Sequence, residues 1–132
     1  MLTKRVLIAD DTDSMRGIIA DFLRKRPGFE ICGEARNGTD AVEKAKHLKP
    51  DLVLLDISMP IMSGLEAASI IKKHVPDTAI ILFTMTGEYY RPALIKAVGV
   101  DAILAKPDGL AAVAEAIDSV LKRRNRPALK TP

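Results

Sequence analysis

Cysteine is nearly absent from the 132-residue sequence, and long apolar runs are absent altogether. The single cysteine, Cys32, excludes an internal disulfide and fits a reducing compartment. The longest apolar runs are far shorter than a membrane span. The first residues lead directly into a strand pattern, without the layout of a signal peptide. These absences predict a soluble, cytoplasmic protein with no membrane partner.

Acidic residues are missing from the last eleven positions, and this absence changes how the net charge of +3 is interpreted. Five basic residues lie in that stretch: Lys122, Arg123, Arg124, Arg126 and Lys130. Without them, 15 basic and 17 acidic residues remain, a net charge of −2. Nucleic-acid binding requires a basic face on the folded part. The basic stretch is therefore interpreted as a solvated helix end, with a nucleic-acid-binding arm as the alternative.

Strand and helix patterns alternate five times along the chain. The predicted strands cover residues 5–9, 30–35, 52–56, 79–84 and 102–105. This alternation predicts an α/β fold with a five-stranded parallel sheet and helices on both faces. The length suits one domain, so we predict a folded domain over residues 1–124 and a basic linker or disordered tail over residues 125–132.

Apolar residues with helical spacing lie between the predicted strands. In the first helix, the spacing i, i+3, i+4, i+7 predicts one buried stripe: Met15, Ile18, Ile19 and Phe22. The pattern recurs in the last helix: Leu110, Val113, Ala114, Ile117 and Leu121. Ser63 and Glu66 have the spacing of a capping box and predict the start of the third helix. Gly99 predicts a left-handed end to the fourth helix.

Polar residues collect where the predicted strands end. Asp10 and Asp11 follow the first strand, Asp56 ends the third, Thr84 ends the fourth and Lys106 follows the fifth. Ligands bind at this carboxyl edge of open α/β sheets. Three acids there repel one another unless a cation lies among them, which suits a hard divalent metal with oxygen ligands. A metal site, a nucleophilic carboxylate, a hydroxyl and a lysine are what phosphoryl transfer to a carboxylate requires.

These motifs resemble the receiver domain of bacterial two-component response regulators. The matching residues are Asp10-Asp11, Asp56 in Asp-Ile-Ser-Met-Pro-Ile-Met-Ser-Gly-Leu-Glu, Thr84 and Lys106-Pro107. The similarity runs from about Lys4 to Leu121. It implies a flavodoxin-like doubly wound sheet with strand order 2-1-3-4-5. The segment 9–16 also resembles chemotaxis receivers, whereas the loop after Asp56 looks most like receivers that carry a DNA-binding domain.

The resemblance implies a role for each residue at this edge. Asp56 would accept a phosphoryl group, and Thr84 and Lys106 would contact its oxygens. Mg²⁺ would be held by oxygen ligands: Asp11, Asp56, the backbone carbonyl of Ser58 and, through a water, Asp10. Mg²⁺ and Lys106 would neutralise the charge that develops during transfer. Pro107 would follow a cis peptide that aims Lys106.

The resemblance also implies the partners of the protein. The phosphoryl donor would be a histidine of a sensor kinase or phosphotransfer protein, and phosphorylation would change the surface to control an output, with a homodimer as one form of that change. The protein would not be an enzyme beyond self-catalysed phosphotransfer and dephosphorylation. DNA binding would need an effector domain absent from this chain, so a stand-alone receiver and a truncated DNA-binding regulator both remain open.

Two positions depart from the usual receiver pattern. Met85 follows Thr84 where the family has a small residue, and its long side chain is expected to narrow access to the phosphoacceptor. Ile103 stands where the family has a Tyr or Phe that moves inward with the threonine. Because a β-branched side chain is stiff, a weaker relay is expected. Tyr89 and Tyr90 could take over that relay, although partly exposed helix-start aromatics are the more common case.

Two other classes fit parts of the pattern. Asp11 and Asp13 after an apolar strand resemble the first motif of haloacid-dehalogenase-type phosphatases, with Asp11 as nucleophile and Asp13 as acid/base. That class needs a late acidic pair and leaves Asp56 unexplained. A flavodoxin-like mononucleotide binder would require a Ser/Thr/Gly loop after the first strand, where this chain has repelling carboxylates. Both are therefore disfavoured against the receiver.

Overall fold

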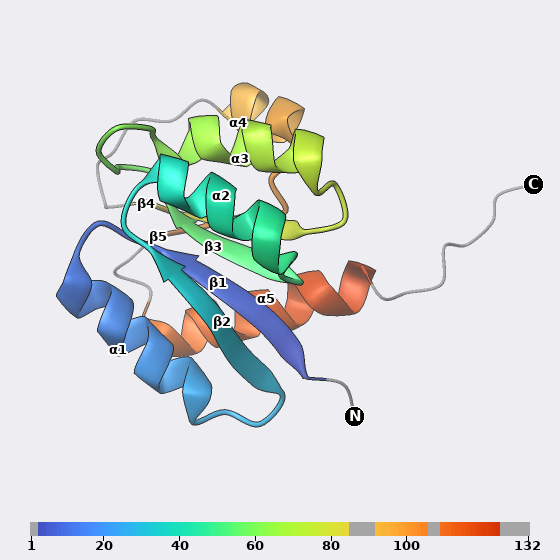
Figure 1. Cartoon of the computed structure of the whole chain (residues 1–132). Helices are drawn as coiled ribbons and strands as arrows, with labels where there is room; N and C mark the ends of the chain where they lie inside the picture. Colours follow the sequence, from blue (N-terminus) through green and yellow to red (C-terminus); the bar gives the residue numbers. More distant parts are fainter. Residues whose placement is uncertain (1–2, 85–91, 106–108, 125–132) are drawn as a thin grey trace, which may run out of the picture.

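The computed structural model describes residues 3–84, 92–105 and 109–124, and Figure 1 shows their arrangement. Its strands are β1 (Lys4–Ala9), β2 (Phe29–Ala35), β3 (Leu52–Asp56), β4 (Ala79–Thr84) and β5 (Ala102–Ala105). Its helices are α1 (Asp13–Arg24), α2 (Gly38–Leu48), α3 (Gly64–His74), α4 (Pro92–Val98) and α5 (Leu110–Arg124). All neighbouring strands are parallel, in the order β2-β1-β3-β4-β5. The predicted fold class and strand order are confirmed.

Unbroken apolar runs lie in β1, β3, β4 and β5, whereas Glu30, Gly33 and Glu34 interrupt β2. Every residue of β3 is buried, which is typical of a parallel strand covered on both faces. The predicted bounds of β3, β4 and β5 are confirmed, and β1 and β2 each begin one residue earlier than predicted. The predicted tail, residues 125–132, lies outside the described residues.

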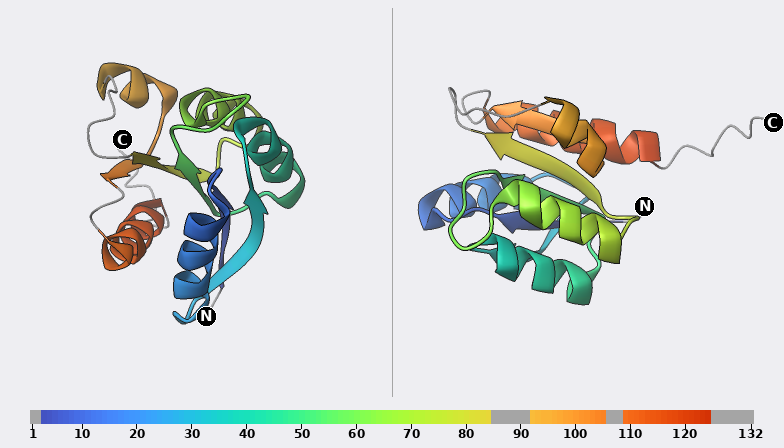
Figure 2. Two further views of the ribbon diagram at one scale, coloured as in Figure 1. Left: turned by 90° about the vertical axis from the view of Figure 1, so that its left-hand side faces the viewer. Right: turned by 90° about the horizontal axis from the view of Figure 1, so that it is seen from above.

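Two layers of helices cover the sheet, as the turned views in Figure 2 show. Alternate residues of each strand point to opposite faces. In β1, Val6 and Ile8 pack against α1 and α5, whereas Leu7 and Ala9 pack against α2 and α3. The half-buried Cys32 packs on the second face, and burial raises the pKa of its thiol. Cys32 therefore packs against this part of the core as a small apolar side chain.

The buried stripe of α1 differs from the predicted one. Its buried residues are Arg16, Ile19, Ala20 and Leu23. Met15 and Phe22 are partly buried, but Ile18 is 51% exposed, so its predicted burial is wrong. The buried stripe is shifted by about one position from the predicted one, and Arg16 faces inward, where its Nη1 donates to the Asp10 carbonyl. The predicted stripe of α5 is confirmed, with Leu110 partly buried and the other four residues buried.

The predicted start of α3 and the predicted end of α4 are confirmed. The Ser63 side chain accepts a hydrogen bond from the backbone N–H of Glu66, and the Glu66 side chain accepts one from the backbone N–H of Ser63. Gly99 has a φ of 90°, the left-handed conformation expected after α4. Across the described ranges, no helix has both the length and the apolar character needed to cross a membrane.

The capping box at α3 provides a test of local stability. Replacing Ser63 with Ala removes an acceptor for an N-terminal N–H, so Ser63→Ala should lower the free energy of unfolding by about 1 kcal/mol. Thr12 is the matched control, because it precedes α1 without a side-chain capping bond. Urea unfolding without Mg²⁺ measures both variants. Equal losses for Ser63→Ala and Thr12→Ala would contradict the capping account.

Candidate functional site

The pairing register of β1 and β3 brings the predicted acids together at the carboxyl edge of the sheet. Ala9 pairs with Leu55, so Asp10 and Asp56 are the next residues on neighbouring strands. One carboxylate oxygen each from Asp10, Asp11 and Asp56 lies within 4.8 Å of the others. Asp10 and Asp56 are each 1% exposed, whereas Asp11 is open to solvent. The predicted acidic cluster is therefore present.

The cluster has the chemistry of a site for a hard cation. Three carboxylates this close repel one another, and the burial of two of them strengthens that repulsion. Carboxylate oxygens are ligands that Mg²⁺ prefers, and Mg²⁺ usually takes one or two carboxylates and keeps several waters. Within the described residues, Asp11 is the solvent-exposed member of this cluster.

The backbone after β3 holds Asp56 in place. The N–H of Ser58 donates to Asp56 Oδ1 at 3.1 Å, and the N–H of Ile57 donates to the Phe83 carbonyl at 2.9 Å. The first bond orients the carboxylate, and the second ties the chain after β3 to β4. Asp56 therefore lies on a rigid strand end, with little freedom to leave the cluster.

Two glycines allow the loop after Asp56 to fold back closely. A Cβ on Gly64 would lie 2.1 Å from the Asp56 carbonyl oxygen, and one on Gly38 would lie 2.2 Å from the Met62 carbonyl oxygen. The N–H of Gly38 donates to that same Met62 carbonyl at 3.1 Å. The close approach to Asp56 is what requires glycine at position 64.

Asp10 is held from three directions. Its N–H donates to the Ala35 carbonyl at 3.0 Å, and its Oδ1 accepts from the N–H of Thr12 at 2.9 Å. Its backbone carbonyl accepts from Nη1 of Arg16 at 2.7 Å. Sequence reasoning missed Arg16. The available signal was an arginine at a position where α1 faces the sheet.

Asp13 does not join the acidic cluster. Arg16 Nη2 donates to the Asp13 carboxylate. This hydrogen bond and the charges of Arg16 and Arg36 hold the pKa of Asp13 below its ordinary value. The Asp13 carboxylate is thus paired with Arg16 and is not a member of the acidic cluster. The phosphatase alternative, which needs Asp13 as acid/base, therefore has no support.

Part of the predicted site lies at or beyond the limits of the described structure. Thr84 ends β4 and pairs with Ala105, which places its backbone at the same edge as the acids. Lys106, Pro107 and the predicted cis peptide lie outside the described residues, as do Met85, Tyr89 and Tyr90. Ile103 pairs with Leu82 and is half-buried against the face covered by α2 and α3. The predicted weakening of the relay stays a prediction.

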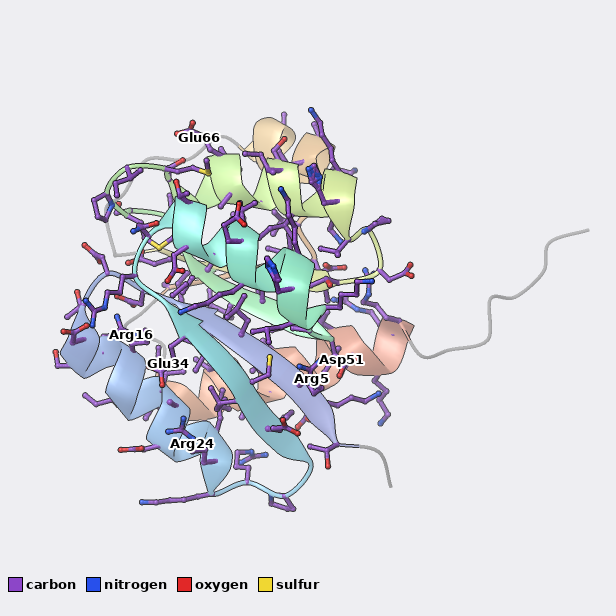
Figure 3. All side chains as sticks on the ribbon, in the orientation of Figure 1. Arg5, Arg16, Arg24, Glu34, Asp51 and Glu66 are labelled. Atoms are coloured by element: carbon purple, nitrogen blue, oxygen red, sulfur yellow. The ribbon has the colours of Figure 1, made fainter. Side chains whose placement is uncertain are left out.

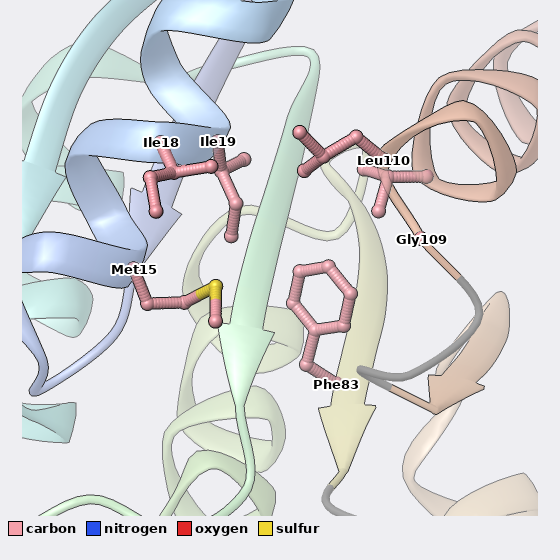
Figure 4. Close-up of a pocket in the computed structure, with 7 residues that line it drawn as sticks. Met15, Ile18, Ile19, Phe83, Gly109 and Leu110 are labelled. Carbon is pink, nitrogen blue, oxygen red and sulfur yellow. The ribbon is translucent and has the colours of Figure 1, made fainter.

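An apolar pocket lies between α1 and α5 (Figure 4). Its volume is about 160 Å³, and its lining includes Met15, Ile18, Phe83 and Leu110. No acid of the cluster lines it. Among the described residues, no polar side chain lines the pocket, so it is distinct from the acidic cluster. The exposed Ile18 is one of the pocket's lining residues.

Ile61, in the loop after Asp56, has a strained backbone. Its φ is 70°, and its side chain is 82% exposed. A β-branched residue is a genuine outlier in this region, with a cost on the order of 1–3 kcal/mol. Asn tolerates the same conformation, so Ile61→Asn should raise the free energy of unfolding by about 1 kcal/mol.

Urea unfolding of the metal-free protein checks this prediction. Ile61→Val is the matched control because valine keeps the β-branch, and its free energy of unfolding should stay near that of the wild type. A loss of stability in Ile61→Asn would show that the strain is not relieved.

Comparisons with known proteins agree with this geometry. The model of the response regulator receiver domain family matches residues 6–118. The chemotaxis protein CheY of Thermotoga maritima is 42% identical over 121 residues, covering 90% of this chain and 98% of that protein. The response regulator domain of T. maritima CheB has a TM-score of 0.81 at 29% identity, covering 95% of this chain and 98% of that chain.

Similarity extends to longer proteins. A protein-glutamate methylesterase/protein-glutamine glutaminase of Pyrococcus abyssi is 42% identical over 84 residues, which cover 64% of this chain but 23% of that protein. Its enzymatic activity is therefore not transferred to this chain. The family match, by contrast, spans nearly all described residues and includes Asp10, Asp11 and Asp56. The chain belongs to the response regulator receiver domain family and is a phosphorylation-activated signalling receiver.

Proposed function

We propose that Asp56 is the residue of this receiver that accepts the phosphoryl group. The observation that carries the proposal is the cluster of Asp10, Asp11 and Asp56 at the carboxyl edge of the sheet. Asp56 is the member that ends a central strand and whose Oδ1 is oriented by the N–H of Ser58. A carboxylate held in one orientation needs little reorganisation to attack phosphorus.

Transfer exchanges one bond to phosphorus for another. An oxygen of Asp56 forms a bond to the phosphorus while the bond between phosphorus and the donor's histidine nitrogen breaks. The imidazole leaves with the electron pair of that bond, and an acyl phosphate remains on Asp56. Later attack of water on phosphorus releases inorganic phosphate and restores the carboxylate. Thr84 and Lys106 are proposed to contact the phosphoryl oxygens in both steps.

Mg²⁺ is the metal that we propose for the acidic cluster. Asp11, Asp56 and the backbone carbonyl of Ser58 would bind it directly, and Asp10 would bind it through a water. When bound, the ion offsets the negative charge of the phosphoryl oxygens. The oxygen-only donor set and the repulsion among three carboxylates support a hard divalent cation over a softer transition metal.

Receiver domains interact with histidine kinases or phosphotransfer proteins. For this chain, we propose a donor of that kind and a phosphorylation-dependent homodimer. Asp11, the exposed member of the cluster, lies where such a donor could reach the site. The folded domain over residues 1–124, a linker or tail after it and the cytoplasmic location remain predictions of the sequence.

Labelling with acetyl phosphate, a small-molecule donor, tests the proposed function. Intact-mass spectrometry should show one added phosphoryl group per chain in the presence of Mg²⁺. Chelation of Mg²⁺ should prevent labelling, because the acids then repel the incoming group. Labelling that proceeds equally without a divalent ion would contradict the proposed metal role.

A further inference from the structure

We infer that Arg16 is a positioning residue for the metal site, which fixes the peptide between Asp10 and Asp11 so that their carboxylates face the same cation. The inference rests on the proposed function and adds to it a residue that does not touch the metal or the phosphoryl group.

Arg16 is buried more deeply than a solvated arginine would be. Its side chain is 9% exposed, although arginine is almost never buried unless it is paired. Nε donates to Oε1 of Glu34 at 3.1 Å, Nη2 donates to Asp13, and Nη1 donates to the Asp10 carbonyl at 2.7 Å. Figure 3 shows Arg16 beside Glu34 of β2.

These contacts aim one donor at the acidic edge. A guanidinium is planar, so its donors point in fixed directions. The carboxylates of Glu34 and Asp13 therefore set the orientation in which Nη1 meets the Asp10 carbonyl. Glu34 and Asp13 come from β2 and the start of α1, so the guanidinium joins three elements at the site.

The Asp10 carbonyl belongs to the peptide that leads into Asp11. Because a peptide unit is planar, a hydrogen bond to this carbonyl also fixes the nitrogen of Asp11. The N–H of Asp10 is fixed in turn by the Ala35 carbonyl. Hydrogen bonds thus hold the backbone on both sides of the Asp10 side chain. The peptide plane that leads into Asp11 is fixed as well.

Because Arg16 is positively charged, its role can be tested by whether its removal strengthens or weakens Mg²⁺ binding. By Coulomb's law alone, a cation near three carboxylates weakens Mg²⁺ binding, and its removal should strengthen binding. If Arg16 acts by position, its removal should weaken binding. Glu34 and Asp13 offset its charge, which lets the guanidinium serve as an anchor with little repulsion of the metal.

Mg²⁺ titration of the full chain by calorimetry, without any phosphodonor, separates these effects. Arg16→Met should raise the Mg²⁺ dissociation constant by about tenfold or more, as loss of a group that orients a metal ligand does. Arg16→Lys keeps the charge but lacks the planar fork, so it should also weaken binding, by a smaller factor.

Arg24→Met is the matched control. Arg24 lies on the same helix and also pairs with Glu34, at 3.6 Å, but its side chain is 51% exposed. Its loss removes the same charge and an ion pair to the same acid, so the dissociation constant should change by less than about twofold. Figure 3 shows Arg24 farther along α1 than Arg16.

Amide hydrogen exchange in metal-free protein gives a second readout. The N–H of Thr12 donates to Asp10 Oδ1. Its exchange rate should therefore be higher in Arg16→Met than in the wild type, and the same as in the wild type in Arg24→Met. A folded Arg16→Met that binds Mg²⁺ as tightly as the wild type, or more tightly, would overturn the inference. If Arg16→Met does not fold, the Mg²⁺ affinity of Arg16→Lys is compared with that of the wild type instead, and equal or tighter binding would again overturn the inference. A wild type that binds no Mg²⁺ would overturn the proposed metal site as well.

Discussion

Asp56→Asn is expected to abolish phosphoryl labelling of this receiver. The substitution keeps the size and shape of the side chain and can still accept the hydrogen bond from Ser58 N–H. It removes the negative charge and the nucleophilic carboxylate oxygen on which the acyl phosphate would form. With acetyl phosphate and Mg²⁺, intact-mass spectrometry should show the wild type labelled and Asp56→Asn unlabelled.

A matched aspartate at the opposite edge of the sheet controls for nonspecific phosphorylation. Asp77 precedes β4 and lines a separate pocket with His74 and Pro76. Asp77→Asn should label as the wild type does. Full labelling of Asp56→Asn at another residue would show that the phosphoacceptor has been assigned wrongly.

Asp11→Ala is expected to weaken Mg²⁺ binding more than any other single change at the cluster that leaves Asp56 intact. Asp11 is the exposed member, and we propose that it contacts the ion directly. Loss of one carboxylate should cost on the order of 1–3 kcal/mol of binding free energy. Asp10→Ala should cost less, because its contact is proposed to pass through a water.

Calorimetric titration with Mg²⁺ measures these differences. Asp21→Ala is the control, since Asp21 is an exposed acid of α1 that pairs with Arg24 away from the cluster. Its dissociation constant should stay near that of the wild type. Equal titration curves for the wild type and Asp11→Ala would place the metal elsewhere.

The acidic edge could be predicted because strand ends are visible in the sequence. An apolar run such as that of β3 stops where a polar residue follows, so Asp10 and Asp56 could be assigned to the ends of parallel strands. Parallel strands with helical crossovers place all their carboxyl ends on one edge. The order of the strands required the family resemblance, because alternation alone allows several orders.

The side-chain environment of α1 could not be predicted in the same way. Periodicity defines an apolar stripe only to within about one position, so Ile18 was predicted as buried although it borders an opening. Arg16 was not considered for the interior, because an arginine is buried only when partners from other elements meet it. Those partners, Glu34 and the Asp10 carbonyl, become neighbours only in the folded chain.

The loop after Asp56 illustrates a second limit. Sequence indicates turn residues there, but not the backbone angles they adopt. Gly64 is required by its approach to the Asp56 carbonyl, and Ile61 takes a left-handed conformation that its side chain disfavours. Both features depend on how the loop is held, including the hydrogen bond from Gly38 to Met62.

A crystal structure with Mg²⁺ and beryllofluoride, a mimic of the phosphoryl group, tests the central claim most directly. The account predicts beryllium bonded to an Asp56 carboxylate oxygen, and Mg²⁺ bound by Asp11, Asp56 and the Ser58 carbonyl. Beryllofluoride on Asp11, or Mg²⁺ bound away from these groups, would contradict it.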